Sequence, residues 1–162
     1  TSRNADLHNI MFWLMGDLSL ATGGEIILTG FFLVIGFITI YIYSRPLNLI
    51  VTGEETAMQL GVNVEKTKKI LFLVSSLVTG VAVSVSGIIG FVGLIIPHII
   101  RMLLGSDHRL LLPASFLFGA SFLAVADTIA RTITAPSELP VGVITALCGA
   151  PYFIYLLRRR TV

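Results

Sequence analysis

The sequence is short of charged residues. Only 12% of its 162 residues are Asp, Glu, Lys or Arg, whereas 55% are hydrophobic. A soluble domain typically carries about 25% charged residues, so this chain has too few to cover a solvated surface. Intrinsic disorder is excluded as well, because disordered chains are poor in apolar residues and rich in charge. An integral membrane protein is therefore the expected class.

Cysteine is nearly absent, and groups that could support catalysis are scattered. Cys148 is the single cysteine, which excludes a disulfide scaffold. The three histidines have no second ligand at metal-binding spacing, and no phosphate-binding loop or Ser-His-Asp arrangement occurs. No basic stripe is interleaved with exposed aromatics, as nucleic-acid binding would require. We expect no enzyme, no metal site, no cofactor and no nucleic-acid partner.

Long charge-free runs are what the sequence has in quantity. A spanning helix needs about 20 mainly apolar residues, because each residue advances the helix by ~1.5 Å. Runs 26–44 and 139–157 meet this requirement, and 110–126 is expected to continue as a helix to Arg131. A fourth run, 70–100, is too long for one span and too short for two.

The fourth run is interrupted by residues that break helices, namely Gly87, Gly90, Gly93 and Pro97. Glycine loosens a helix and proline removes a backbone donor. We expect a full span over 70–86, a broken re-entrant turn, and a short helix over 94–104. Irregular backbone at membrane depth persists only when it is buried in protein or lines water, so 87–97 is a candidate hinge or pathway segment. The alternative is that the glycines only permit close helix packing.

The N-terminal apolar segment 7–16 is too short to span a bilayer. With Trp13 suited to the headgroup level, it is expected to form a short interfacial helix, unless it is the tail of a truncated span. Because the sequence begins at Thr1 without a signal-peptide pattern, we interpret it as a mature chain or an excised piece. The expected fold is an all-α membrane protein. It is a polytopic helical bundle of about four full transmembrane helices, one short broken helix and one outer interfacial helix.

Basic residues indicate the orientation. Of the 11 Lys and Arg residues, nine lie in 44–69, 101–109 and 158–160, and two lie elsewhere, Arg3 and Arg131. Positive charge in short loops marks the cytoplasmic side. The three basic segments and the C-terminus are therefore expected in the cytoplasm, and 1–25, 87–93 and 132–138 outside.

The longest cytoplasmic loop, 45–69, contains a predicted helix of about two turns. Thr52 or Gly53 can cap this helix, two acids fill its first turn, and Gly61 can end it. Ala57, Met58 and Leu60 give it a small apolar face. The residues alone leave two interpretations open, a docking element for a cytoplasmic partner or an ordinary amphipathic linker.

Polar residues inside the spans are few. Asp127 and Arg131 stand four apart, which favours an ion pair on one helix. This pair either neutralises itself at a helix end or presents Arg131 to an acidic partner outside the membrane. In the last span, small residues are expected to pack, and Thr145 and Cys148 are candidates to face a pathway.

Three longer strings resemble one known family. They run from Ser86 to His98 (SGIIGFVGLIIPH), from Asp107 to Pro113 (DHRLLLP), and from Glu138 to Ile154 (ELPVGVITALCGAPYFI). Together with Ser44-Arg-Pro-Leu-Asn48 and the 53–61 segment, they resemble the FecCD-type permeases, the transmembrane subunits of ATP-binding-cassette (ABC) importers for iron-siderophores, haem and vitamin B12. Members have ten helices per subunit. The resemblance therefore implies that 1–162 is a single permease region, the C-terminal half of such a subunit.

The resemblance also implies partners and roles. The cytoplasmic ATPase would dock on Gly53, Glu54, Glu55, Ala57, Gln59, Leu60 and Gly61. Arg131 would meet a glutamate of an extracytoplasmic substrate-binding protein, in a bacterial or archaeal plasma membrane. A second permease subunit, as a homodimer, and the missing N-terminal half would complete the pathway. From the residues alone, half of a secondary transporter remains an alternative, because such proteins also use broken helices.

Overall fold

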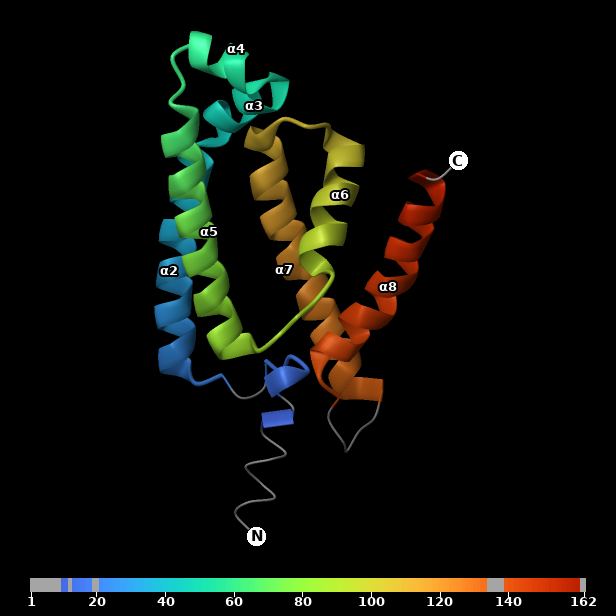
Figure 1. Cartoon of the computed structure of the whole chain (residues 1–162). Helices are drawn as coiled ribbons and strands as arrows, with labels where there is room; N and C mark the ends of the chain where they lie inside the picture. Colours follow the sequence, from blue (N-terminus) through green and yellow to red (C-terminus); the bar gives the residue numbers. More distant parts are fainter. Residues whose placement is uncertain (1–9, 12, 19–20, 134–138, 161–162) are drawn as a thin grey trace.

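The structure is a computed structural model that describes residues 10–11, 13–18, 21–133 and 139–160. Its labelled helices, shown in Figure 1, are α2 (Gly23–Ile42), α3 (Ser44–Thr52), α4 (Glu54–Gln59), α5 (Val64–Ser86), α6 (Val92–Leu104), α7 (His108–Ile133) and α8 (Val141–Arg160). The described part of the chain contains no strand. The expected all-α fold is confirmed.

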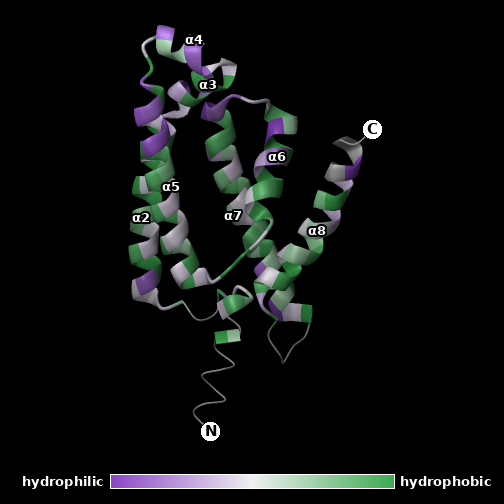
Figure 2. Ribbon diagram, in the orientation of Figure 1, coloured by the Kyte–Doolittle hydropathy of each residue, from purple (hydrophilic) through white to green (hydrophobic). Residues whose placement is uncertain are grey.

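Three helices of the described part are long and apolar enough to cross a membrane, namely α2, α5 and α7. Helix α6 is apolar but has only 13 residues, as expected for the short broken helix. Helix α8 is 20 residues long, and its apolar stretch is Val141–Tyr155. Figure 2 shows hydrophobic residues along the shafts and hydrophilic residues gathered on α4, α3 and the start of α5.

The long helices form two groups. Helix α2 packs along α5, and α6, α7 and α8 pack on one another. Gly36 permits the first contact, because a side-chain carbon at this position would collide with Val78. In the second group, Ile96 and Ile100 of α6 meet Leu111 of α7 in a small buried cluster.

Helix α3 links the two groups at one end of the bundle (Figure 1). It contacts α2 and α5 of the first group, α7 of the second, and α4. The N-terminal segment around Met15 and the irregular segment 87–91 link the groups at the opposite end. There, the Asp17 N–H donates to the Ser86 carbonyl over 3.1 Å.

Several predicted boundaries were wrong. The segment 44–52, expected to be loop, is helix α3, and Pro46 fits because it lies in the first turn, where backbone N–H groups have no helical partner. Helix α5 begins at Val64 rather than 70, with the Asn63 side chain accepting a hydrogen bond from Lys66 N–H over 3.0 Å. The irregular backbone of the fourth run is confined to 87–91, because α6 begins at Val92.

Two expectations fall partly outside the described residues. Of the predicted interfacial helix 7–16, the structure shows helical backbone at 10–11 and 13–14. Of the predicted outer loop 132–138, residues 134–138 lie outside the described part of the chain.

Candidate docking surface and membrane hinge

The candidate docking surface is α4 with the two glycines that flank it. Gly53 alone separates α3 from α4 and has a φ of 136°, a conformation that favours glycine. Thr52 does not cap α4, because its hydroxyl donates back to the Leu49 carbonyl over 2.7 Å. Of the two predicted caps, Thr52 and Gly53, it is Gly53 that occupies the N-cap position of α4. Gly53 has no side chain that could accept a hydrogen bond there.

Gly61 ends the helix as predicted. Its φ is 86°, its N–H donates to the Met58 carbonyl over 3.0 Å, and the next N–H, of Val62, donates to the Ala57 carbonyl over 2.9 Å. This pair of bonds is the Schellman motif, in which a left-handed residue satisfies the last carbonyls of a helix. The two glycines therefore hold α4 as a compact projection at the end of the bundle.

The apolar side chains of α4 do not share one face. Ala57 is fully buried against the rest of the chain, whereas Met58 and Leu60 are 55% and 62% exposed. The predicted apolar face is therefore split, with Ala57 fixing the helix and the other two side chains available to a partner. Glu55 and Gln59 are exposed beside them.

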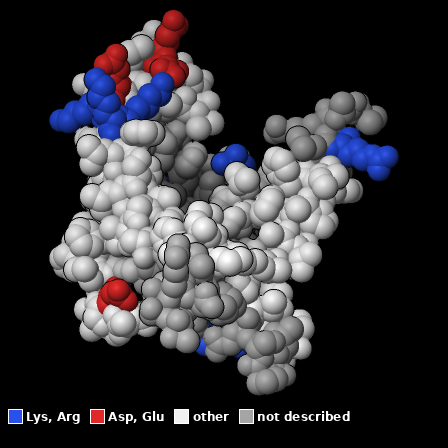
Figure 3. Space-filling view, turned by 60° about the horizontal axis from the view of Figure 1, so that its bottom comes forward, with Lys and Arg blue, Asp and Glu red and all other residues white. Residues whose placement is uncertain are grey.

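Charges surround these side chains. Glu54 forms an ion pair with Lys68, and Glu65 pairs with Lys69 over 3.5 Å on the first turns of α5. Figure 3 shows the acidic and basic side chains gathered as a patch over this corner of the molecule. The surface thus combines two exposed apolar side chains with a mixed charged rim, a composition suited to a protein partner.

A polar cluster ties α3 to the loop between α6 and α7. The Asn48 side chain donates to Asp107 Oδ1 over 2.6 Å and accepts from His108 N–H over 2.9 Å. The same amide oxygen lies 2.7 Å from His108 Nδ1. The Arg109 N–H, with the Asn48 amide, stabilises the ionised carboxylate and lowers the pKa of Asp107. No role was predicted for these residues, which appeared only within the family-like strings.

At the opposite end of α7, Arg131 Nε donates to Asp127 Oδ2 over 2.8 Å. The predicted pairing at this spacing is confirmed. The arginine side chain remains 44% exposed, so the pair neutralises charge without hiding the guanidinium. Its meeting with an acidic partner stays a prediction.

The broken segment differs from the expected hinge in detail. Gly87 has a φ of 66°, and a side chain there would collide with the Trp13 carbonyl. Gly90 and Gly93 face open space within the structure, and Gly93 and Pro97 lie inside α6. Only Gly87 among the four predicted hinge residues is thus required by close packing in this structure.

Phe91 carries strain that the sequence did not reveal. It has a φ of 66° although it is not glycine. Its ring and β-carbon pack where a side chain at Gly149 of α8 would otherwise stand. The segment is therefore anchored to α8 by an aromatic side chain in addition to turning on a glycine.

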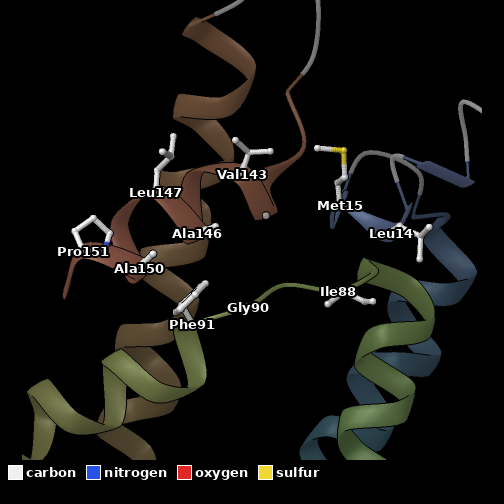
Figure 4. Close-up of a pocket in the computed structure, with 11 residues that line it drawn as sticks. Leu14, Met15, Ile88, Gly90, Phe91, Val143, Ala146, Leu147, Ala150 and Pro151 are labelled. Atoms are coloured by element: carbon white, nitrogen blue, oxygen red, sulfur yellow. The ribbon is translucent and has the colours of Figure 1, made fainter. Parts of the chain in front are cut away.

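An open apolar groove of about 560 Å³ lies beside this segment (Figure 4). The N-terminal segment, the 87–91 segment and α8 all contribute to its lining, which consists of Leu14, Met15, Ile88, Gly90, Phe91, Gly142, Val143, Ala146, Leu147, Ala150 and Pro151. Thr145 does not line the groove, because it is 1% exposed and donates to the Gly142 carbonyl over 3.0 Å. Cys148 is exposed on α8 but outside this lining. The pathway roles of both stay predictions.

Comparison with known proteins places this architecture in a family. The family model described as the FecCD transport family matches residues 1–159. The chain is 49% identical over 157 residues to the cobalamin import system permease protein BtuC of Halobacterium salinarum, covering 97% of this chain and 42% of that protein. It is 45% identical over 159 residues to the hemin transport system permease protein HmuU of Yersinia pestis, covering 98% of this chain and 48% of that protein.

A solved structure agrees. A metal-chelate type ABC transporter in an inward-facing conformation superposes with a TM-score of 0.86 at 35% identity, covering 94% of this chain and 49% of that one. The chain thus spans less than half the length of the relatives named here. The predicted resemblance is confirmed, and the chain belongs to the FecCD transport family.

Proposed function

We propose that residues 1–162 are the C-terminal half of a permease subunit in an ABC importer for metal chelates such as iron-siderophores, haem or cobalamin. The observation that supports this function is the near-complete match to import permeases, which covers 97% and 98% of the chain for the cobalamin and hemin relatives. The N-terminal half and a second copy of the complete permease, as a homodimer, would complete the pathway. Half of a secondary transporter is disfavoured by this family membership.

The proposed coupling begins at α4. A separate cytoplasmic ATPase subunit docks on Glu54–Gln59 and the adjoining Leu60 and Gly61, with Met58 and Leu60 as its apolar contacts. Because Gly53 joins α4 directly to α3, and α3 contacts both helix groups, a push on α4 reaches both. ATP-driven closure would then switch the spans between two discrete packings. The permease itself makes and breaks no bond.

The proposed orientation puts α3, α4 and the start of α5 in the cytoplasm of a bacterial or archaeal cell. The basic residues Lys66, Lys68 and Lys69 lie at this end of the bundle, and Figure 1 shows the C-terminal end of α8 at the same level. Positive charge is retained on the cytoplasmic side of membrane proteins. The C-terminus is therefore proposed to be cytoplasmic.

The opposite end would receive the substrate-binding protein. Arg131 lies there near the last turn of α7, with 44% of its side chain exposed. An acidic side chain of the binding protein would compete with Asp127 for the guanidinium. Replacing Arg131 with Glu should weaken this docking, and unchanged docking at low salt would remove the role.

The docking proposal is tested by replacing Met58 and Leu60 with Ser in the intact transporter. The measurement is the affinity of the ATPase subunit for the permease and the stimulation of ATP hydrolysis by the loaded binding protein. Loss of two central apolar contacts should weaken assembly by at least tenfold, because such residues each contribute about 1–2 kcal/mol at protein interfaces. Glu54→Gln and Gln59→Ala extend the test to the polar rim.

Leu103→Ser is the matched control. Leu103 is 70% exposed near the end of α6, at the same end of the bundle but on another helix. It should leave assembly unchanged. Equal effects at Leu103 and at the α4 positions would contradict the docking assignment, and a permease that neither binds an ATPase nor depends on ATP would contradict the importer function.

A further inference from the structure

A second cavity lies at the proposed cytoplasmic end, away from the apolar groove. It has a volume of about 330 Å³ and is lined by Tyr41, Ile42, Ser44, Arg45 and Arg109. These residues come from the last turn of α2, the first turn of α3 and the first turn of α7. The cavity therefore lies between the two helix groups, at the ends of the membrane-length helices α2 and α7.

The cavity carries the positive charge of two arginines, and the charge of Arg109 interacts with the nearby Asp107 carboxylate. Neither Arg45 nor Arg109 forms an ion pair within the described part of the chain. The adjacent acid is Asp107, whose Oδ1 already accepts hydrogen bonds from the Asn48 amide and the Arg109 N–H. Neither guanidinium is thus held in an ion pair of the described residues, and guanidinium forks match phosphate oxygens better than other cationic side chains do.

The rim of the same cavity is apolar on its membrane side. Tyr41 and Ile42, at the end of the membrane-length helix α2, are 42% and 68% exposed. A ligand that fits this arrangement carries a phosphate next to a hydrocarbon portion. Basic pockets between transmembrane helices on the cytoplasmic side have this combination when they bind anionic lipid head groups.

We infer that the Arg45–Arg109 cavity binds the phosphate of an anionic phospholipid from the cytoplasmic leaflet. The lipid seats its headgroup between the two arginines and its glycerol and first methylenes against Tyr41 and Ile42. A free phosphate ion shares the headgroup chemistry but not the apolar contact. The choice of leaflet rests on the proposed orientation, whereas the lipid-binding test depends on neither substrate transport nor ATPase docking.

The test uses the intact permease in detergent, with phosphatidylglycerol as the probe and phosphatidylcholine of the same acyl chains as the neutral comparison. Native mass spectrometry counts bound lipid at increasing concentration. The wild type should retain phosphatidylglycerol in preference to phosphatidylcholine. Arg45→Gln and Arg109→Gln should each weaken its binding about fivefold, as expected for loss of one basic residue near a lipid headgroup, and the double variant more.

Arg158→Gln is the matched control, because it removes the same charge from an exposed position near the end of α8, outside the cavity. It should bind lipid like the wild type. A variant with both Arg45→Lys and Arg109→Lys keeps both charges and controls for misfolding. It should retain most of the lipid binding. Unchanged phosphatidylglycerol binding in the double Gln variant, or an equal loss in Arg158→Gln, would overturn the inference. If the cavity bound inorganic phosphate but not phosphatidylglycerol, the ligand would be a free phosphate ion and the lipid proposal would be wrong.

Discussion

The sharpest structural prediction concerns Gly142, the second residue of α8. Its N–H lies 3.3 Å from the Gly16 carbonyl, and its α-carbon abuts the backbone of Met15. A β-carbon added at Gly142 would collide with the Met15 carbonyl oxygen. Gly93, the second residue of α6, occupies the same helical position with nothing near its α-carbon. Comparing the alanine variants of these two glycines therefore separates the effect of packing on stability from the effect of helix propensity.

The cost of Gly142→Ala follows from these distances. A carbon and a carbonyl oxygen approach no closer than ~3.3 Å, so the N-terminal segment must move away from α8. Backbone cannot rotate away as a side chain can, and overpacking of this kind typically costs about 1–3 kcal/mol. Loss of the Gly142–Gly16 hydrogen bond adds about 1 kcal/mol, and the better helix propensity of Ala returns at most a similar amount. The expected destabilisation is about 1–3 kcal/mol.

The assay is thermal unfolding of the intact permease in detergent, followed by monomer recovery on size exclusion. Gly142→Ala should lower the midpoint by a few degrees, because the shift per kcal/mol becomes smaller as the chain becomes longer. Gly93→Ala should leave it unchanged or raise it slightly. If both variants behaved alike, the backbone contact between α8 and the N-terminal segment would be absent in the folded protein.

Three further predictions address the proposed cytoplasmic end. Asn48→Asp should destabilise the permease in chemical unfolding, because it replaces the amide that donates to Asp107 with a second carboxylate. Gly61→Ala should destabilise α4 by about 1 kcal/mol, since φ is 86° there, and faster protease cleavage near 61 would report it. The pKa of Asp107 is lowered from 3.8. Its ionised form therefore contributes stability that is present above that value and lost as pH falls through the lower folded pKa, so unfolding of Asp107→Asn should depend less on pH below about 4.

The parts of the site that the sequence predicted depend on neighbouring residues. Gly53 and Gly61 could be assigned because a helix start and a helix end are decided within a few residues. The Asp127–Arg131 pair followed from spacing on one helix. The membrane class followed from composition alone, because apolar runs of this length have few other uses.

The parts that the sequence did not predict depend on residues far apart in the chain. Asn48 meets Asp107 and His108 across 59 and 60 positions, which no local pattern reports. The strain at Phe91 exists because α8 offers it the space above Gly149. Gly90 and Gly93 looked equivalent to Gly87, yet only Gly87 abuts backbone from another segment, since spacing cannot show which glycine a neighbour approaches.

The same long-range contacts give the proposed mechanism its physical form. Helix α4 contacts α5 of the first group directly, and its link to the second group runs through α3 at one end of the bundle. Helix α3 holds the second group partly through Asn48, whose partners lie in the turn between α6 and α7. At the other end, backbone contacts around Gly87 and Gly142 resist separation of the groups. A push that tilts α3 should therefore rotate the groups about this glycine-packed end rather than slide them apart, and the apolar groove beside Phe91 lies next to that pivot.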